Sequence, residues 1–201
     1  MTREKLRQLR ARIRTVEGRS PAYAILLAQR YLHADPSHVL TRLLLGRLLT
    51  ELARYDEAER ELRRALKECP RDHRSIALSQ LGHSLRAQHR DEEAIEAYRH
   101  AVETDPVNTG AHVFLGALLA KLGRLDEAEA TCRNALEQCY EGELSEVWLN
   151  LGFVLRAKGR FIDAASAFRE ALVLDPNYRE AKTALRDVER CVAYRIKSRK
   201  R

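Results

Sequence analysis

A pattern of small and apolar residues recurs along the chain at a spacing of 34 residues, and this repeat constrains the fold more than any other feature. Apolar residues three and four positions apart indicate helices, and a proline cannot continue a helix. We therefore predict two helices and a stop in each unit. The last complete unit, residues 145–178, shows the pattern as Leu151, Gly152, Leu155, Ala164, Phe168, Ala171 and Pro176.

Three earlier units repeat these positions, over residues 39–72, 75–108 and 109–142. A glycine in the first helix and an alanine in the second let two helices approach closely where they cross. A chance helical periodicity would not preserve that glycine. The crossing glycines of the three units are Gly46, Gly82 and Gly116, and the facing alanines are Ala58, Ala94 and Ala128.

The spacing between units is interrupted twice by two-residue insertions, residues 73–74 and 143–144. We expect the first insertion to lengthen the loop and not the helices. Before the second, Tyr140 stands where the proline is expected, so Gly142 and Ser145 are predicted to supply the stop and the next N-cap.

Both ends of the chain depart from the pattern. Residues 1–38 are expected to form a degenerate N-terminal repeat or a capping helix pair, with Arg12 in the crossing-glycine position and Ala28 in the aromatic position. Residues 179–196 carry a single apolar stripe and are expected to form a capping helix over the last pair. Residues 197–201 form a basic tail.

The repeated unit resembles the tetratricopeptide repeat family, because Trp148 precedes Leu151 and Gly152, Ala164 precedes Phe168 by four residues, and Pro176 ends the unit. The resemblance covers nearly the whole chain, with four good copies and a degenerate copy over residues 5–38. It implies an all-α fold, a right-handed superhelix of helix-turn-helix repeats with a C-terminal capping helix. It also implies a non-enzymatic scaffold or adaptor that binds a peptide segment in a concave groove, as part of a multiprotein assembly.

On a helical wheel, the second, fifth, ninth and twelfth positions of each unit point away from the packing face. This face is not expected to be needed for the core, and in the family it lines the groove. The expected ligand is a protein or peptide with apolar anchors and acidic residues. The predicted peptide-binding residues, which include two sixth-position neighbours, are Leu43, Arg47, Ser79, His83, Arg86, Val113, Phe114, Asn150, Phe153 and Arg156.

An alternative interpretation is that the aromatic side chains of this face pack on neighbouring helices and the arginines are solvated. The family's carboxylate clamp is not reproduced, since Val113 and Ala117 occupy positions of its Lys and Asn, although Asn150 matches one position. Recognition of chaperone C-termini that end in a free carboxylate is therefore not predicted.

No catalytic, cofactor-binding or metal-ligating residues are predicted. The closest His and Cys spacings, such as Cys69 with His73, match no known ligand pattern. Cys132 occupies an aromatic core position, where a buried thiol packs as a small hydrophobe. Acidic residues gather at the starts of the second helices, where they complement the helix dipole without any catalytic role.

The charge of the chain is uneven, and it supports a rival function. Residues 1–19 carry seven Lys and Arg against two Asp and Glu, and residues 179–201 carry nine against three. A nucleic-acid-associated protein could bind through these basic ends while the repeats are structural, although only Tyr194 lies near the tail to stack on a base. Self-association through an incompletely covered end repeat, giving a homo-oligomer, is a third possibility.

No apolar run approaches the ~18 residues that a membrane span needs, and the four cysteines are irregularly spaced with no apolar leader before them. These features predict a cytoplasmic location, or a nuclear one if the source is eukaryotic.

Overall fold

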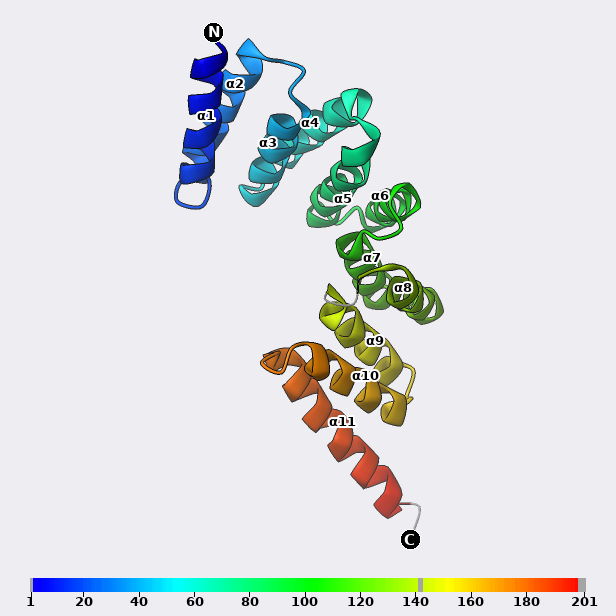
Figure 1. Ribbon diagram of the computed structural model, residues 1–201. Helices are drawn as coiled ribbons and strands as arrows, with labels where there is room; N and C mark the ends of the chain where they lie inside the picture. The colour runs from blue at the N-terminus through cyan, green and yellow to red at the C-terminus, as the bar shows by residue number, and fades with distance from the viewer. Residues whose placement is uncertain (1, 141–142, 199–201) are drawn as a thin grey trace. The chain divides into compact units, whose positions relative to one another are not determined.

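The structure of the chain, a computed structural model, describes residues 2–140 and 143–198, with side chains to residue 194 (Figure 1). All regular elements in this part of the chain are helical. Gly142 and residues 199–201 of the predicted tail lie outside the described residues. The helices are α1 (Arg3–Val16), α2 (Pro21–Ala34), α3 (Val39–Glu51), α4 (Tyr55–Glu68), α5 (Arg71–Ala87), α6 (Asp91–Thr104), α7 (Thr109–Lys121), α8 (Leu125–Gln138), α9 (Ser145–Ala157), α10 (Phe161–Leu174) and α11 (Arg179–Ser198).

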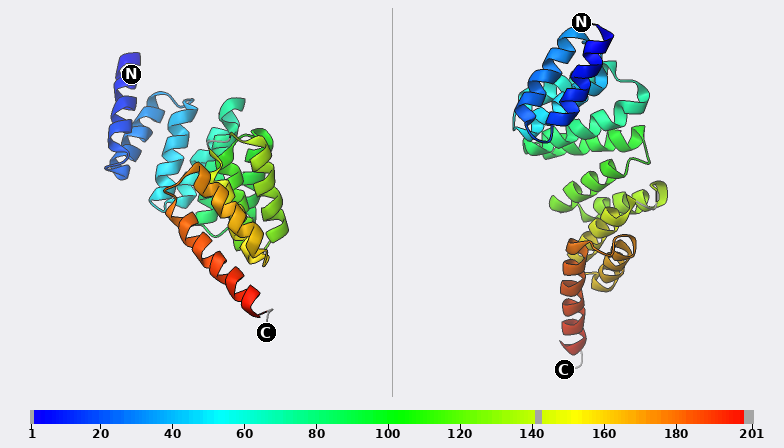
Figure 2. Two further views of the ribbon diagram at one scale, coloured as in Figure 1. Left: turned by 60° about the horizontal axis from the view of Figure 1, so that its bottom comes forward. Right: turned by 60° about the vertical axis from the view of Figure 1, so that its left-hand side comes forward.

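The helices form two compact units, which divide between residues 104 and 105. Unit 1 contains α1–α6 and unit 2 contains α7–α11. Within each unit every helix packs against the next one in sequence (Figure 2). The first helices of adjacent pairs also touch, α3 with α5 and α7 with α9. The all-α helical repeat predicted from the sequence is therefore confirmed.

Each pair in the repeats closes through a three-residue turn that contains one residue in the left-handed region. Gly123 and Gly159 hold this position with φ of 78° and 74°, whereas Ala53 and His89 hold it with φ of 57° and 59°. The arginine that follows donates its backbone N–H to a leucine carbonyl in the last turn of the first helix, for example Arg160 to Leu155 at 2.9 Å. These bonds use carbonyls that would otherwise end the helix without a partner.

The crossing glycines lie directly against the residue sixteen positions later in the second helix. A Cβ atom on Gly152 would stand 2.3 Å from Cε1 of Phe168, and one on Gly82 would stand 2.6 Å from Cε1 of Tyr98. On Gly46 it would stand 2.6 Å from Leu62, and on Gly116 its nearest neighbour would be Sγ of Cys132, at 3.2 Å. The close crossing predicted from the sequence is confirmed, and it is loosest where the facing residue is the small Cys132.

The helix boundaries correct two of the predictions. Residues 73–74 lie inside α5, which is 17 residues long against 13 in α3, so the insertion lengthened the helix and not the loop. Residues 71–75 contain no Gly or Pro, and Asp72 in the first turn favours a helix there. Ser145 is the first residue of α9, and Leu144 holds the N-cap position.

The first pair is built differently from the repeats. Four residues separate α1 from α2, against three between α3 and α4, so α1 presents another face to its partner. Ile13 is buried, whereas Arg12 is exposed and its guanidinium stands 5.5 Å from the centre of the Tyr23 ring. The prediction that Arg12 occupies the helix crossing is wrong for this reason.

Helix α11 covers the end of unit 2, as predicted. Its buried residues Ala181, Ala184 and Val188 join the hydrophobic core that α9 and α10 form, and Leu185 and Val192 pack against that core. The predicted stripe continues to Ile196, whose side chain is outside the described residues. The positions 34 residues after Gly152 and Leu155 are Arg186 and Glu189, both exposed. No second helix could cross closely at an arginine, so the repeat ends here.

Ion pairs link one helix pair to the next within each unit. In unit 1, Glu59 of α4 accepts from Arg90 at 2.6 Å, just before α6. In unit 2, buried Glu129 of α8 accepts from Lys158 at 2.7 Å and from Arg160 at 2.9 Å. The pKa of Glu129 is lowered to about 2, chiefly by the hydrogen bond that Lys158 donates and to a smaller extent by the one from Arg133.

We expect Gly152→Ala to destabilise the protein by about 1–3 kcal/mol, because the new methyl group collides with the Phe168 ring. Gly116→Ala is the matched control, since it adds the same methyl group against a small thiol and gains about 1 kcal/mol of helix propensity. Thermal unfolding followed by circular dichroism measures both. If the two variants lose equal stability, the aromatic contact is not the cause.

We expect Glu129→Gln to lower the stability at pH 7 by about 1–3 kcal/mol, because Arg133 loses its carboxylate and Lys158 and Arg160 keep only one each, Asp126 and Asp163. The folded-state pKa of Glu129 lies below its ordinary value of 4.5. The stability that this carboxylate contributes is therefore present above pH 4.5 and is lost as the pH falls to about 2. Urea unfolding at a series of pH values should show the two proteins converging over this range. A difference that does not change with pH would contradict this account.

Candidate peptide-binding face

The predicted face in unit 1 is largely engaged by other parts of the chain. Arg47 of α3 pairs with Glu17, at the end of α1, at 2.8 Å and with Glu51 at 2.5 Å. Leu43 is buried, with 3% of its surface exposed. The first-helix face is thus part of the core at Leu43, contrary to expectation, and the positive charge of Arg47 is already balanced.

On α5, the predicted residues surround a buried tyrosine. The hydroxyl of Tyr98 lies 2.7 Å from Nδ1 of His83, and the two rings meet edge to face with centres 5.4 Å apart. Burial lowers the pKa of His83 to about 4, so its ring is neutral at pH 7. Nδ1 of the neutral ring can accept a hydrogen bond from the Tyr98 hydroxyl. Ser79 is half-buried one turn before His83, and Arg86 is exposed almost one turn after it.

In unit 2, α7 and α9 contact each other through predicted residues. Val113 is 5% exposed, so the expectation that this face is free of the core is wrong here too. Asn150 donates from Nδ2 to the Val113 carbonyl at 3.1 Å, which ties α9 to α7. Phe114, on the same turn of α7 as Val113, is half-buried. The amide that matched one clamp position therefore has a structural partner.

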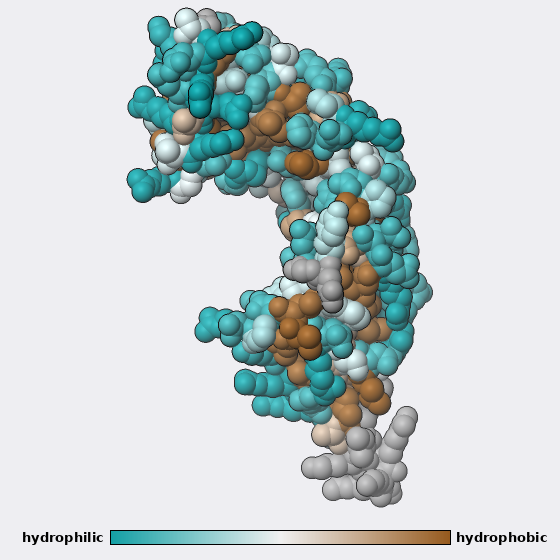
Figure 3. All heavy atoms as spheres, viewed as in Figure 1, coloured by the Kyte–Doolittle hydropathy of each residue, from teal (hydrophilic) through white to brown (hydrophobic). Residues whose placement is uncertain are grey.

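The last two predicted residues stand together at an open cleft. The Phe153 ring packs edge to face on Phe168, with centres 5.3 Å apart, and the Arg156 guanidinium lies 5.1 Å from the Phe153 ring centre. The cleft measures about 490 Å³ and continues onto α11. Hydrophobic surface also gathers where α10 meets α11 (Figure 3). The α11 residues that line the cleft are Arg179, Glu180, Thr183, Ala184 and Asp187.

Sequence reasoning missed the α11 residues because this helix was interpreted only as a cap. The signal was present in the repeat, since Glu180, Thr183 and Asp187 stand 34 residues after Glu146, Leu149 and Phe153. They hold the second, fifth and ninth positions of a further first helix. One face of α11 therefore closes the core while another extends the predicted peptide-binding face.

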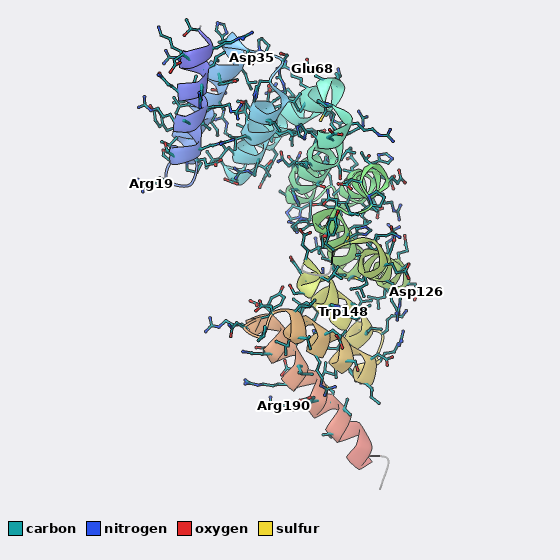
Figure 4. The ribbon with its side chains drawn as sticks, in the orientation of Figure 1. Arg19, Asp35, Glu68, Asp126, Trp148 and Arg190 are labelled. Carbon is teal, nitrogen blue, oxygen red and sulfur yellow. The ribbon has the colours of Figure 1, made fainter. Side chains whose placement is uncertain are left out.

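The lining of the cleft contains two arginines, Arg156 and Arg179, and two acidic residues, Glu180 and Asp187. Among the described residues, neither Arg156 nor Arg179 has a carboxylate partner, in contrast to Arg47. Ion pairs of unit 2 occur around α8, where Asp126 reaches Lys158 at 2.6 Å (Figure 4), and on α11, where the cleft residue Asp187 stands 4.0 Å from Arg190. The half-buried Phe153 ring can accept an apolar side chain, and the unpaired guanidinium groups of Arg156 and Arg179 can accept a carboxylate.

The structure gives no support to cofactor or metal chemistry in the described residues. No group of three or more His, Cys, Asp and Glu side chains is placed there to hold a metal ion. Burial raises the pKa of Cys132 to about 12, so this thiol is protonated, as expected for a core residue. Among the same residues, no helix has an apolar stretch long enough to cross a bilayer.

The chain belongs to the tetratricopeptide repeat family. Three sequence profiles, each described as tetratricopeptide repeat, match residues 19–81, 76–108 and 109–177. Together they extend without a gap from residue 19 to residue 177.

Two curated proteins show what the chain is similar to in sequence. Tetratricopeptide repeat protein 14 of Mus musculus is 31% identical over 103 residues, which is 49% of this chain and 13% of that protein. Protein STIP1 homolog of Dictyostelium discoideum is 34% identical over 102 residues, 48% of this chain and 18% of that protein. The chain thus spans less than a fifth of the length of either relative.

Solved structures share the fold at low sequence identity. A thermophilic TPR protein of Thermus thermophilus, TTC0263, has a TM-score of 0.69 at 20% identity, covering 90% of this chain and 96% of that one. YrrB, described as a TPR protein with an unusual peptide-binding site, has a TM-score of 0.64 at 22% identity, covering 86% and 87%. The first TPR of Spaghetti (RPAP3), bound to an HSP90 peptide, has a TM-score of 0.56 at 23% identity, covering 59% and 93%.

We expect the His83 ring to titrate near pH 4 and not near its ordinary value of 6.5, because burial among the helices of unit 1 disfavours the imidazolium. The Tyr98→Phe variant removes the hydroxyl that stabilises the neutral ring, so its midpoint should move upward. Histidine ring NMR signals followed between pH 3 and pH 8, a range set around these values, measure both. A His83 midpoint at its ordinary value of 6.5 would contradict the buried pair.

Proposed function

We propose that this chain is a non-enzymatic scaffold or adaptor that binds a peptide segment of a partner protein and works within a larger protein assembly. The observation that carries this proposal is the cleft between α9 and α11, where Arg156 stands over the Phe153 ring, Arg179 lines the same opening, and neither arginine has a carboxylate partner among the described residues. The family membership supports a role in protein interaction. The printed descriptions of YrrB and of the first TPR of Spaghetti (RPAP3), which mention peptide binding, are consistent with it.

The expected peptide places an apolar side chain against Phe153 and an acidic side chain near Arg156 and Arg179. The rest of the predicted face contributes less, because Leu43 and Val113 are buried and Arg47 would have to exchange two intramolecular carboxylates for one from the ligand. Phe114 and Asn150 are further candidate contacts within unit 2, and Ser79, His83 and Arg86 are candidate contacts within unit 1. We propose that the protein binds its partner in the cytoplasm, on the basis of the apolar runs and the cysteine spacing described in the sequence analysis.

The comparisons add no support to the nucleic-acid alternative or to a homo-oligomer. Every matched profile is described as tetratricopeptide repeat. The alternative depends on both basic ends, and of these the side chains of residues 195–201 lie outside the described residues.

The proposal is tested by capture of partner proteins from nuclease-treated lysate of the source organism. We expect the double variant Arg156→Glu/Arg179→Glu to lose a protein that the wild type retains. The control Lys182→Glu/Arg186→Glu should retain it, since it makes the same change in charge at exposed positions of α11 outside the cleft.

A version of the chain that ends at Val192 distinguishes peptide binding by the scaffold from nucleic-acid binding through the basic C-terminal end. Retention that survives in this version but fails in the cleft variant supports the scaffold. Retention that disappears with nuclease treatment or with the tail, while the cleft variant binds normally, contradicts the proposal and favours the basic ends.

A further inference from the structure

A second cleft, of about 460 Å³, lies in unit 1 among α2, α3 and α4. None of the residues predicted for peptide binding lines it. Its lining combines buried apolar side chains with exposed basic ones. The leucines are Leu32, Leu45 and Leu49, and the exposed basic residues are His33, Arg60 and Arg64.

The cleft occurs where an ion pair between helix pairs is missing. Glu59 of α4 and Glu129 of α8 each reach forward to the arginine that precedes the second helix of the next pair, Arg90 or Arg160. The residue of α2 that stands 34 positions before Glu59 is Ile25, which is buried. Helix α2 therefore offers no carboxylate to Arg54 there, and Arg54 pairs with Glu57 in its own helix at 2.7 Å.

The charges around the cleft leave an excess of cations. Glu61 is shared by Arg42 at 2.7 Å and Arg64 at 3.0 Å, and Glu57 is held by Arg54. Within the described residues, Arg60 has no carboxylate partner. An acidic ligand would therefore meet the unpaired guanidinium of Arg60 and that of Arg64, which shares Glu61 with Arg42.

The cleft also holds a buried donor that is not used. Arg42 is 7% exposed, and its guanidinium donates to Glu61 and to the Pro36 carbonyl. Its Nε atom is buried and has no hydrogen-bond partner. A buried donor without an acceptor is costly. Because less than 1 Å² of this atom is exposed, an acceptor in the cleft would reach it only after the Arg42 side chain moved.

We propose that the α2–α4 cleft is a second peptide-binding site, which takes an apolar side chain flanked by carboxylates from an acidic segment of a partner protein. The leucines accept the apolar side chain, and Arg60 and Arg64 accept the carboxylates. Charge complementarity selects this occupant, since the two carboxylates of the lining, Glu57 and Glu61, are already engaged by arginines, whereas Arg60 is unpaired and Arg64 shares its partner. The site goes beyond the α9–α11 cleft, because it lies in the other unit and shares no residue with it.

The test uses a capped, fluorescein-labelled peptide, Glu-Glu-Leu-Glu-Glu, and fluorescence anisotropy. The full-length chain carries Arg156→Glu/Arg179→Glu throughout, so that binding at the α9–α11 cleft does not contribute. We expect the further change Arg60→Glu/Arg64→Glu to weaken binding at least about tenfold. The control Arg19→Glu/Arg71→Glu makes the same change in charge at exposed positions of unit 1 outside the cleft and should change binding less than about twofold.

A third variant tests the shape of the site without changing its charge. Gln29 is exposed on α2 and lines the cleft, so Gln29→Trp should fill it and also weaken binding. In amide NMR spectra, the peptide should shift signals of residues 29, 33, 60 and 64. Circular dichroism checks that each variant is folded.

Several outcomes would overturn the second site. These are no binding to the parent chain, equal binding of a Lys-Lys-Leu-Lys-Lys peptide, or equal losses in the cleft and control variants. Displacement of the probe by an equal concentration of free glutamate would assign the cleft to a small anion instead of a peptide. Because the α9–α11 cleft is disabled in every arm, failure here leaves the proposed scaffold function to its own test.

Discussion

The close crossing of two helices inside each pair is the constraint on which the rest of the structure depends. Gly152 and Gly82 can face Phe168 and Tyr98 only because they have no Cβ atom. This contact fixes which side of the first helix is buried against its partner. It thereby leaves another side of that helix for contacts with the next pair and with ligands. The same close crossing therefore determines both the packed side and the side that can bind.

Charge pairing within the chain then decides which parts of that surface can bind a partner. Glu17 and Glu51 balance Arg47, and Glu129 balances a group of cations that includes Lys158. These pairs join successive helices and leave little charge for a ligand. Arg156 and Arg179 in unit 2, and Arg60 in unit 1, stand beside apolar surface and are not engaged in this way. The two proposed sites follow from this uneven pairing, not from the overall charge of the chain.

Helix α11 shows how an end cap can also form part of a site. Arg186 and Glu189 at its crossing positions exclude another helix, while Ala181 and Val188 complete the core of unit 2. Because the helix keeps the register of the repeat, its remaining face follows that of α9. A cap in any other register would protect the core equally well but would not bring Arg179 beside Phe153.

The sequence by itself determined the helix pairs, the crossing glycines, the buried Cys132 and the C-terminal cap, because these depend on residues close together in the chain and on a repeated spacing. Only the tertiary structure decided which face residues are available. Leu43 and Val113 are buried between first helices of adjacent pairs, and Arg47 finds Glu17 thirty residues away. The amide of Asn150 bonds to the carbonyl of Val113, 37 residues earlier. Such contacts form between segments that the periodicity treats as independent, so a helical wheel of one unit could not reveal them.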